Sequence, residues 1–174
     1  MNKSNLVALG ALTALVQAQA ATAQSSKTCV KQADIADAVV YAAPGLVKAA
    51  KRKCASELSK KSFLMSKGDN WASKFAPLKE ASWPGTKRII KQVGAQQVGG
   101  SFSLDALPDS MLRPIADQTF PELLMRDFMK KDCAKVDRML ELASPLPPKN
   151  VGALAAAGLE LTGSKKPVVC PYTK

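Results

Sequence analysis

The fold class depends most on residues 28–58, which read TCVKQADIADAVVYAAPGLVKAAKRKCASEL. Residues 28–43 indicate a helix, because the side chains of Asp34, Asp37 and Tyr41 follow one another at intervals of three and four residues, which places them on one side of a helix. Pro44-Gly45 is typical of a turn. In residues 46–58 the apolar side chains share one helical face, with Lys48 and Arg52 directed away from it. The stretch therefore predicts a helical hairpin that turns at residues 44–45.

The rest of the chain also predicts helices. Short helices are expected around residues 63–65, 71–78 and 86–93, with turns at 68–70 and 82–85. A capping box at Thr119–Glu122 opens a broad apolar stripe that predicts one helix over residues 119–143. The stripe comprises Leu124, Phe128, Met129, Cys133, Val136, Met139, Leu140 and Ala143. An Ala-rich helix over 151–161 is expected to pack on that long helix.

These elements predict an all-α fold. We expect a small, irregular helical bundle of about five to seven helices, including two helical hairpins and stapled by disulfides. Within it, residues 94–102 are expected to form a flexible connector between a basic N-terminal half and a near-neutral C-terminal half.

The four cysteines predict disulfides. An even number of cysteines in an exported chain favours pairing, and Cys29, Cys54, Cys133 and Cys170 allow three connectivities. The expected pairs are Cys29 with Cys54 and Cys133 with Cys170, because each bond would then close its own hairpin. The first pair requires a non-helical or folded-back stretch near Cys29, since the two hairpin arms differ in length. Zinc modules are excluded, because the chain has no histidine and no Cys-x-x-Cys motif.

The N-terminus predicts export. Lys3 precedes an apolar run over residues 6–16 and a small-residue stretch over 17–23, which is the layout of a cleavable signal peptide. Cleavage after Ala23 is preferred to cleavage after Ala20. The apolar run is well short of the ~20 residues that span a bilayer. We therefore expect a signal peptide at 1–23 and a single domain at 24–174, secreted or periplasmic, without a transmembrane span after cleavage.

The charge is concentrated in one part of the chain. The net charge is +11. Residues 44–91 hold twelve basic and three acidic side chains, a balance that attracts anionic surfaces and polymers. The expected partner is therefore lipid head groups, polysaccharide or an acidic protein. The candidate binding residues are Lys48, Lys51, Arg52, Lys53, Lys60, Lys61, Lys87, Arg88 and Lys91. The alternative interpretation is a solvated face that only keeps the protein soluble.

The aromatic side chains in the same stretch admit two interpretations. Basic residues interleaved with aromatic rings can bind single-stranded nucleic acid, but export argues against that partner. Trp71 and Phe75 lie four residues apart, which on a helix places both rings on one face and predicts that they pack in the core.

The sequence predicts no catalytic residue, cofactor site or metal site. The absence of histidine excludes His-based triads and His-activated cysteines. The acid pairs Asp34/Asp37, Asp105/Asp109 and Asp132/Asp137 have spacings that helix faces produce routinely. The leading hypothesis is an exported, non-enzymatic binding protein with a basic surface. The alternatives are a carboxylate- or lysine-dependent enzyme acting on a cell-wall polymer, or a structural or inhibitory partner of another secreted protein, for which exposed apolar area would be the clue.

Overall fold

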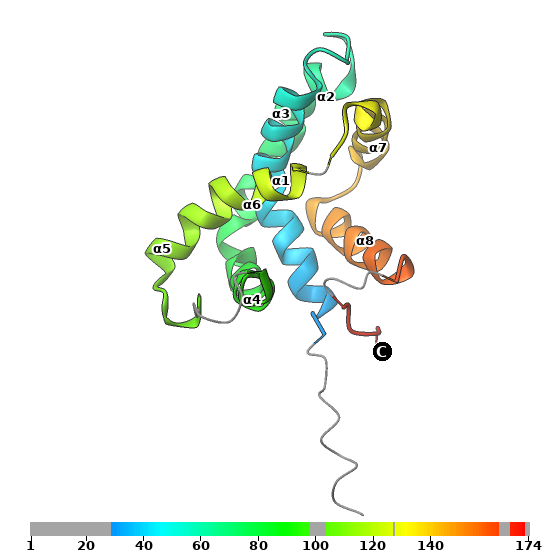
Figure 1. Cartoon of the computed structure of the whole chain (residues 1–174). Helices are drawn as coiled ribbons and strands as arrows, with labels where there is room; N and C mark the ends of the chain where they lie inside the picture. Colours follow the sequence, from blue (N-terminus) through cyan, green and yellow to red (C-terminus); the bar gives the residue numbers. More distant parts are fainter. Residues whose placement is uncertain (1–28, 98–103, 127, 164–167, 173–174) are drawn as a thin grey trace, which may run out of the picture.

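The computed structural model describes residues 29–97, 104–126, 128–163 and 168–172. Within these ranges the chain is helical, with one isolated parallel bridge between Val30 and Val169. Helix α1 (Gln32–Cys54) runs through the middle of the molecule, and the other helices pack around it (Figure 1). The predicted all-α, disulfide-stapled bundle is confirmed.

The helices along the chain differ widely in length. After α1 come α2 (Phe63–Ser66), α3 (Gly68–Ser73), the 3-10 helix η1 (Ala76–Leu78) and α4 (Lys79–Gln97). The 3-10 helix η2 (Leu104–Ala106), α5 (Asp109–Pro114), the π-helix η3 (Ile115–Thr119) and α6 (Phe120–Met125) follow. The chain then forms the 3-10 helix η4 (Lys130–Asp132), α7 (Cys133–Ala143) and α8 (Pro148–Leu161). Helices α4, α6 and α8 pack directly on α1.

The hairpin expected at Pro44-Gly45 is wrong, because α1 continues through both residues. A proline inside a helix lacks one N–H donor and costs about 3 kcal/mol. The burial of α1 offsets this cost: Val40, Val47 and neighbouring alanines lie in the core. A Cβ on Gly45 would come within 2.7 Å of the Pro121 ring of α6. The Pro-Gly pair therefore marks a close helix crossing and not a turn.

Helix α4 repeats this pattern. The turn expected at residues 82–85 is absent, and α4 runs through Pro84-Gly85. A Cβ on Gly85 would overlap the Asp37 side chain of α1, so this glycine also lies where two helices meet. Helix α4 ends at Gln97 and so extends four residues into the expected connector. The remainder of that connector, like the signal segment 1–23, lies outside the described residues.

The single helix expected over residues 119–143 is also wrong. Four elements cover this range: the end of η3, then α6, η4 and α7. The Lys53 ammonium donates to the main-chain carbonyls of Met125 (2.6 Å) and Arg126 (3.2 Å) and so caps the end of α6. The predicted apolar stripe is divided accordingly. Phe128, Leu140 and Ala143 pack against the core, whereas the side chains of Met129 and Met139 are exposed.

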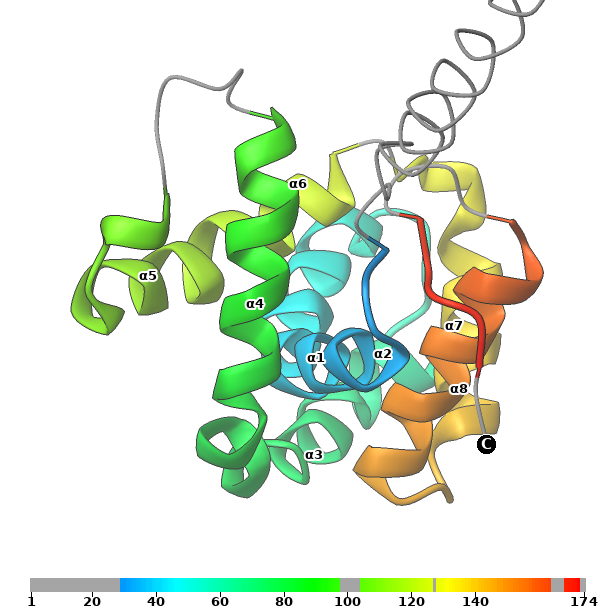
Figure 2. The same ribbon diagram turned by 90° about the horizontal axis from the view of Figure 1, so that it is seen from below.

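The disulfides connect Cys29 with Cys170 and Cys54 with Cys133, so the expected pairing is wrong. Because α1 is continuous, Cys29 and Cys54 lie at opposite ends of a helix about 33 Å long, whereas disulfide-bonded Cα atoms lie within about 7 Å. The C-terminal tail therefore lies beside the N-terminal segment at residues 29–31, as Figure 2 shows. Likewise, α8 packs on α1 and not on the long helix that the sequence predicted.

Candidate anion-binding surface

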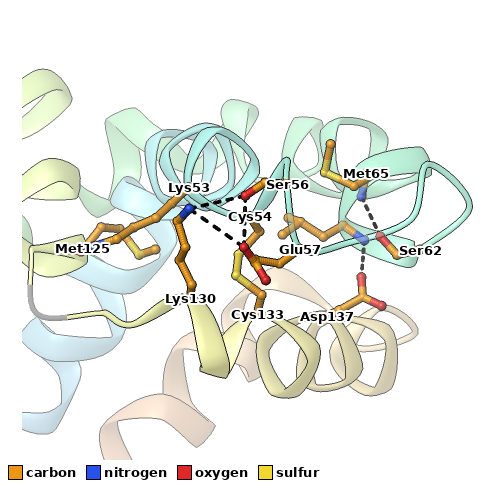
Figure 3. The surroundings of a disulfide bond; sticks show 11 residues. Lys53, Cys54, Ser56, Glu57, Ser62, Met65, Met125, Lys130, Cys133 and Asp137 are labelled. Carbon is orange, nitrogen blue, oxygen red and sulfur yellow. Dashed lines mark hydrogen bonds and ion pairs between the residues drawn. A yellow bond between two sulfur atoms is a disulfide. The ribbon is translucent and has the colours of Figure 1, made fainter.

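The buried disulfide Cys54–Cys133 fixes the C-terminal end of α1. Cys54 is the last residue of α1 and Cys133 the first residue of α7, and both are buried in the main core. Lys130 of η4 reaches across this junction to Ser56 and Glu57 (Figure 3). The loop after α1 carries Lys60 and Lys61. Its beginning is therefore held by the disulfide and by the contacts of Lys130.

The short helices α2 and α3 bury their apolar side chains and direct their lysines outward. Leu64 and Phe75 are fully buried, and the rings of Trp71 and Phe75 meet edge to face with centroids 4.7 Å apart. The prediction that Trp71 and Phe75 lie in the core is confirmed. The Leu64 N–H donates to the Asp137 carboxylate of α7 at 2.6 Å (Figure 3). Because the apolar faces point inward, Lys67 and Lys74 at the ends of α3 are exposed.

Five lysines near the end of α1 are exposed and form no ion pair with any described residue. We call them the free-lysine surface, and they are Lys48, Lys60, Lys61, Lys67 and Lys74. Lys48 lies on α1, and the other four lie in the loop after it, or at the ends of α3. Between residues 48 and 74 the chain has eight basic and two acidic side chains. Among the described residues, this part of the chain therefore carries more positive charge than its ion pairs neutralise.

The other basic side chains of this region already have partners. Lys51 pairs with Asp69 of α3, and Arg52 pairs with Glu122 of α6. Lys53 caps α6 and also lies over the Phe128 ring, 5.9 Å from its centroid. Of the predicted binding residues in this region, Lys48, Lys60 and Lys61 are thus the ones whose ammonium groups make no ion pair with a described residue.

The predicted residues on α4 lie elsewhere, and two of them are paired with acids from other helices. Lys87 pairs with Asp109 at 3.0 Å, and Arg88 binds the buried Asp34 carboxylate through two nitrogens. Lys91 is only partly exposed. Asp34 and Lys51 are about 25 Å apart along α1. The structure therefore does not bring Lys87, Arg88 and Lys91 together with the lysines at the other end of α1.

The described acids have structural roles. Asp34 binds Arg88, Asp132 contacts Lys135, and Asp137 accepts the Leu64 N–H. The hydrogen bond from Trp83, and then the one from Lys87, lowers the pKa of Asp109. The hydrogen bond from Arg113 lowers the pKa of Glu80. The side chain of Asp105 lies outside the described residues.

Asp37 is the exception among these acids, because no described residue donates a hydrogen bond to its half-buried carboxylate. Burial, with a smaller contribution from the neighbouring Asp34, raises its pKa. Three of the surface pockets are lined entirely by described residues, and each of these three contains at most one carboxylate. Within the described residues no group of three metal-binding side chains gathers, and no helix there has the length and apolarity to cross a bilayer.

Sequence reasoning did not include Lys67 and Lys74 in the candidate set. Both belong to the same basic stretch, and the signal that could have found them is that stretch's excess of basic over acidic side chains. Whether a lysine is paired depends on acids such as Asp69 and Asp109, which only the tertiary fold brings near. Comparison of the chain with protein-family models, curated proteins and solved structures gives no match.

Proposed function

We propose that this protein is exported and docks, without catalysing a reaction, on an anionic partner of the cell envelope or the extracellular space through the free-lysine surface. The observation that carries the proposal is that Lys48, Lys60, Lys61, Lys67 and Lys74, which lie close together in the sequence, are all exposed and make no ion pair with a described residue. Uncompensated charge of one sign attracts and steers polyanions.

Two further observations support the proposal. Two disulfides are typical of proteins that fold in an oxidising compartment, which agrees with the predicted signal peptide. The aromatic rings of the basic stretch pack inward: Trp71, Phe75 and Trp83 are buried, and the partly buried Phe63 packs against the main core. They cannot stack on nucleotide bases, so the attraction at this surface is electrostatic.

The test compares two triple variants with the same loss of charge. The first, K60Q/K61Q/K67Q, removes three lysines of the free-lysine surface. The control, K31Q/K131Q/K149Q, removes three exposed lysines elsewhere that make no ion pair with a described residue. Binding to polygalacturonate and to phosphatidylglycerol vesicles is measured over a range of salt concentrations.

We expect the first variant to lose affinity by roughly 100-fold at low salt, because each lysine near an anionic surface contributes about 1 kcal/mol, which is about a fivefold gain. Its salt dependence becomes shallower, since fewer exposed charges remain to be screened. The control variant binds nearly as the unmodified protein does. Equal losses in both variants, or affinity that does not change with salt, would contradict the proposal.

A second candidate function is an interaction with another protein through α7 and α8. Large apolar side chains on both helices are exposed, with Leu161 at 87 % and Met139 at 68 %, and Leu142 and Leu154 are exposed as well. Exposed apolar area of this kind marks interaction surfaces when it is contiguous. The variant M139S/L142S separates the two candidates, because polygalacturonate binding does not involve these residues.

A further inference from the structure

Two pockets lie beside α6, where that helix crosses α1. One, of about 270 Å³, is lined by Tyr41, Lys48, Lys79 and Asp117 together with Pro44, Gly45 and Pro121; we call it the Lys79 pocket. The other, of about 600 Å³, is lined by Arg52, Lys53, Thr119, Glu122 and Arg126 with Ala49 and Met125; we call it the Arg52 pocket. Figure 1 shows α6 lying against the middle of α1.

Both pockets contain the same combination of charged groups. Each combines at least two cationic side chains with one carboxylate, and that carboxylate binds one of the cations. In the Lys79 pocket, Asp117 lies 2.7 Å from the Lys79 ammonium, and in the Arg52 pocket Glu122 pairs with Arg52. Carboxylates of the chain itself thus occupy the positions where an incoming oxyanion would bind.

The Lys79 pocket keeps additional binding capacity for an anion. Lys48 lines it and makes no ion pair with a described residue. The Lys79 ammonium also lies over the Tyr41 ring, 4.5 Å from its centroid. Burial, followed by the nearby Asp117, raises the pKa of Tyr41 to about 12, so this side of the pocket presents a neutral phenol and no second negative charge at neutral pH.

The two pockets are connected along one helix. Lys48 and Arg52 are four residues apart on α1, so they are neighbours on the same face, with Cβ atoms about 5–6 Å apart. The π-helix η3 supplies Asp117 to one pocket and Thr119 to the other. Single π-helical turns occur frequently at functional sites, and here that turn sets the positions of both pocket walls.

We propose that the two pockets form one binding site for a linear acidic polymer, whose neighbouring carboxylate or phosphate groups bind between Lys48 and Lys79 and at Arg52. This inference rests on the proposed function and narrows its partner to one class. Lys48 lines one pocket and Arg52 the other, one helical turn apart on α1, so successive charged groups of one flexible chain can reach both. The free-lysine surface supplies the long-range attraction, and the pockets supply the contacts.

The test uses the Glu122 carboxylate, which competes with an incoming anion for Arg52. Replacing it by an amide in E122Q releases Arg52 and removes a like charge, so affinity for a short oligogalacturonate should rise several-fold. The variant R52Q should lower that affinity about tenfold. The matched controls are E141Q and R138Q, because Arg138 and Glu141 form an equally exposed ion pair on α7. Both exposed pairs contribute little to stability, so all four variants are expected to fold.

Four outcomes decide the matter. A rise in E122Q and a fall in R52Q, with E141Q and R138Q unchanged, support the site. Identical behaviour of E122Q and E141Q, or of R52Q and R138Q, overturns it. An equal response of phosphatidylglycerol vesicles to E122Q overturns the choice of a polymer over lipid head groups. If K60Q/K61Q/K67Q loses affinity while E122Q and R52Q bind as the unmodified protein does, the pocket site fails and the proposed function stands.

Discussion

At the scale of single residues, the Asp109 carboxylate connects α5 to α4. It accepts a hydrogen bond from the Trp83 indole N–H at 2.7 Å and another from the Lys87 ammonium at 3.0 Å. Arg113 of α5 lies over the same indole ring and pairs with Glu80 of α4. Polar contacts that surround one buried tryptophan therefore help to hold α5 in place.

These contacts predict a change at acidic pH. The hydrogen bonds from Trp83 and Lys87 lower the pKa of Asp109 below its ordinary value of about 3.9. A carboxyl group with a lowered pKa contributes stability that is present above the ordinary value and is lost as the pH falls through the folded-state pKa. In a W71F background, where Trp83 is the sole tryptophan, its fluorescence should change with a midpoint below about pH 3.9.

The D109N variant is the control for this titration. It should remove the transition, because the amide does not titrate and still accepts the indole N–H. A midpoint at or above the ordinary aspartate pKa, or an unchanged transition in D109N, would show that another group controls the Trp83 environment. The W71F background is mild, since the buried Trp71 N–H has no hydrogen-bond partner among the described residues.

At the scale of helices, small residues set how closely α1 and its neighbours pack. A Cβ on Gly152 of α8 would lie 2.6 Å from the Ala36 carbonyl oxygen of α1. Main-chain atoms cannot move aside as a flexible side chain does, so one helix would have to shift. Gly158 lies two turns later on the same helix, and nothing lies within 4 Å of the Cβ that it would gain.

This difference predicts opposite effects of one substitution at two positions of α8. G152A should destabilise the protein by about 1–3 kcal/mol, because it overpacks the contact with α1. G158A should stabilise it by about 0.5–1 kcal/mol, because alanine loses less backbone entropy in a helix than glycine does. Urea denaturation followed by circular dichroism measures both free energies of unfolding. A G152A variant as stable as G158A would refute the close packing of α8 on α1.

The same packing explains which elements the sequence predicted and which it did not. The 3-4 periodicity of apolar side chains indicated helices correctly, because helix burial follows from that spacing. It could not distinguish a Pro-Gly turn from a Pro-Gly helix crossing, since the local residues are identical and only Pro121 and Asp37 reveal the difference. The same periodicity also predicted one helix where the structure has α6 and α7. The end of α6 could not be foreseen, because Lys53, which caps it, lies more than seventy residues earlier in the chain.

At the scale of the whole molecule, the fold separates charges that are adjacent in sequence. The basic composition of residues 44–91 predicted a region of positive charge. It did not predict which of its basic side chains are paired with acids and which are not. Lys87 and Arg88 are tied to Asp109 and Asp34, while Lys60 and Lys61 remain without an ion pair to a described residue. Which lysines are paired depends on contacts between segments far apart in the chain, and these contacts cannot be inferred from a single sequence.

Disulfide connectivity is also a property of the whole chain. Once α1 is continuous, Cys54 lies at its far end and reaches Cys133, while Cys29 at its near end meets Cys170. The two bonds differ in environment. Cys54 and Cys133 are 0 % and 1 % exposed, whereas Cys29 and Cys170 are both partly exposed and Cys170 lines a surface pocket.

This difference predicts the order in which the bonds are reduced. Exchange requires a thiolate to reach a disulfide sulfur, so a dilute thiol should open Cys29–Cys170 first and leave Cys54–Cys133 intact. Trapping with iodoacetamide and peptide mass spectrometry would identify the opened pair. The helical circular dichroism signal should persist at this stage, because main-chain hydrogen bonds from Val30 to Val168 (2.8 Å) and from Cys170 to Val30 (2.9 Å) still hold the tail.

Opening of the second bond should instead coincide with loss of structure. Cys54–Cys133 lies inside the main core and joins α1 to α7, so a thiol reaches it only after that core opens. Removing a native disulfide from a small secreted domain costs about 2–5 kcal/mol, and C54S/C133S should therefore lower the free energy of unfolding by an amount in that range. Simultaneous reduction of both bonds in the folded protein, or earlier reduction of Cys54–Cys133, would mean that the core around α7 opens more readily than the junction of the two chain ends.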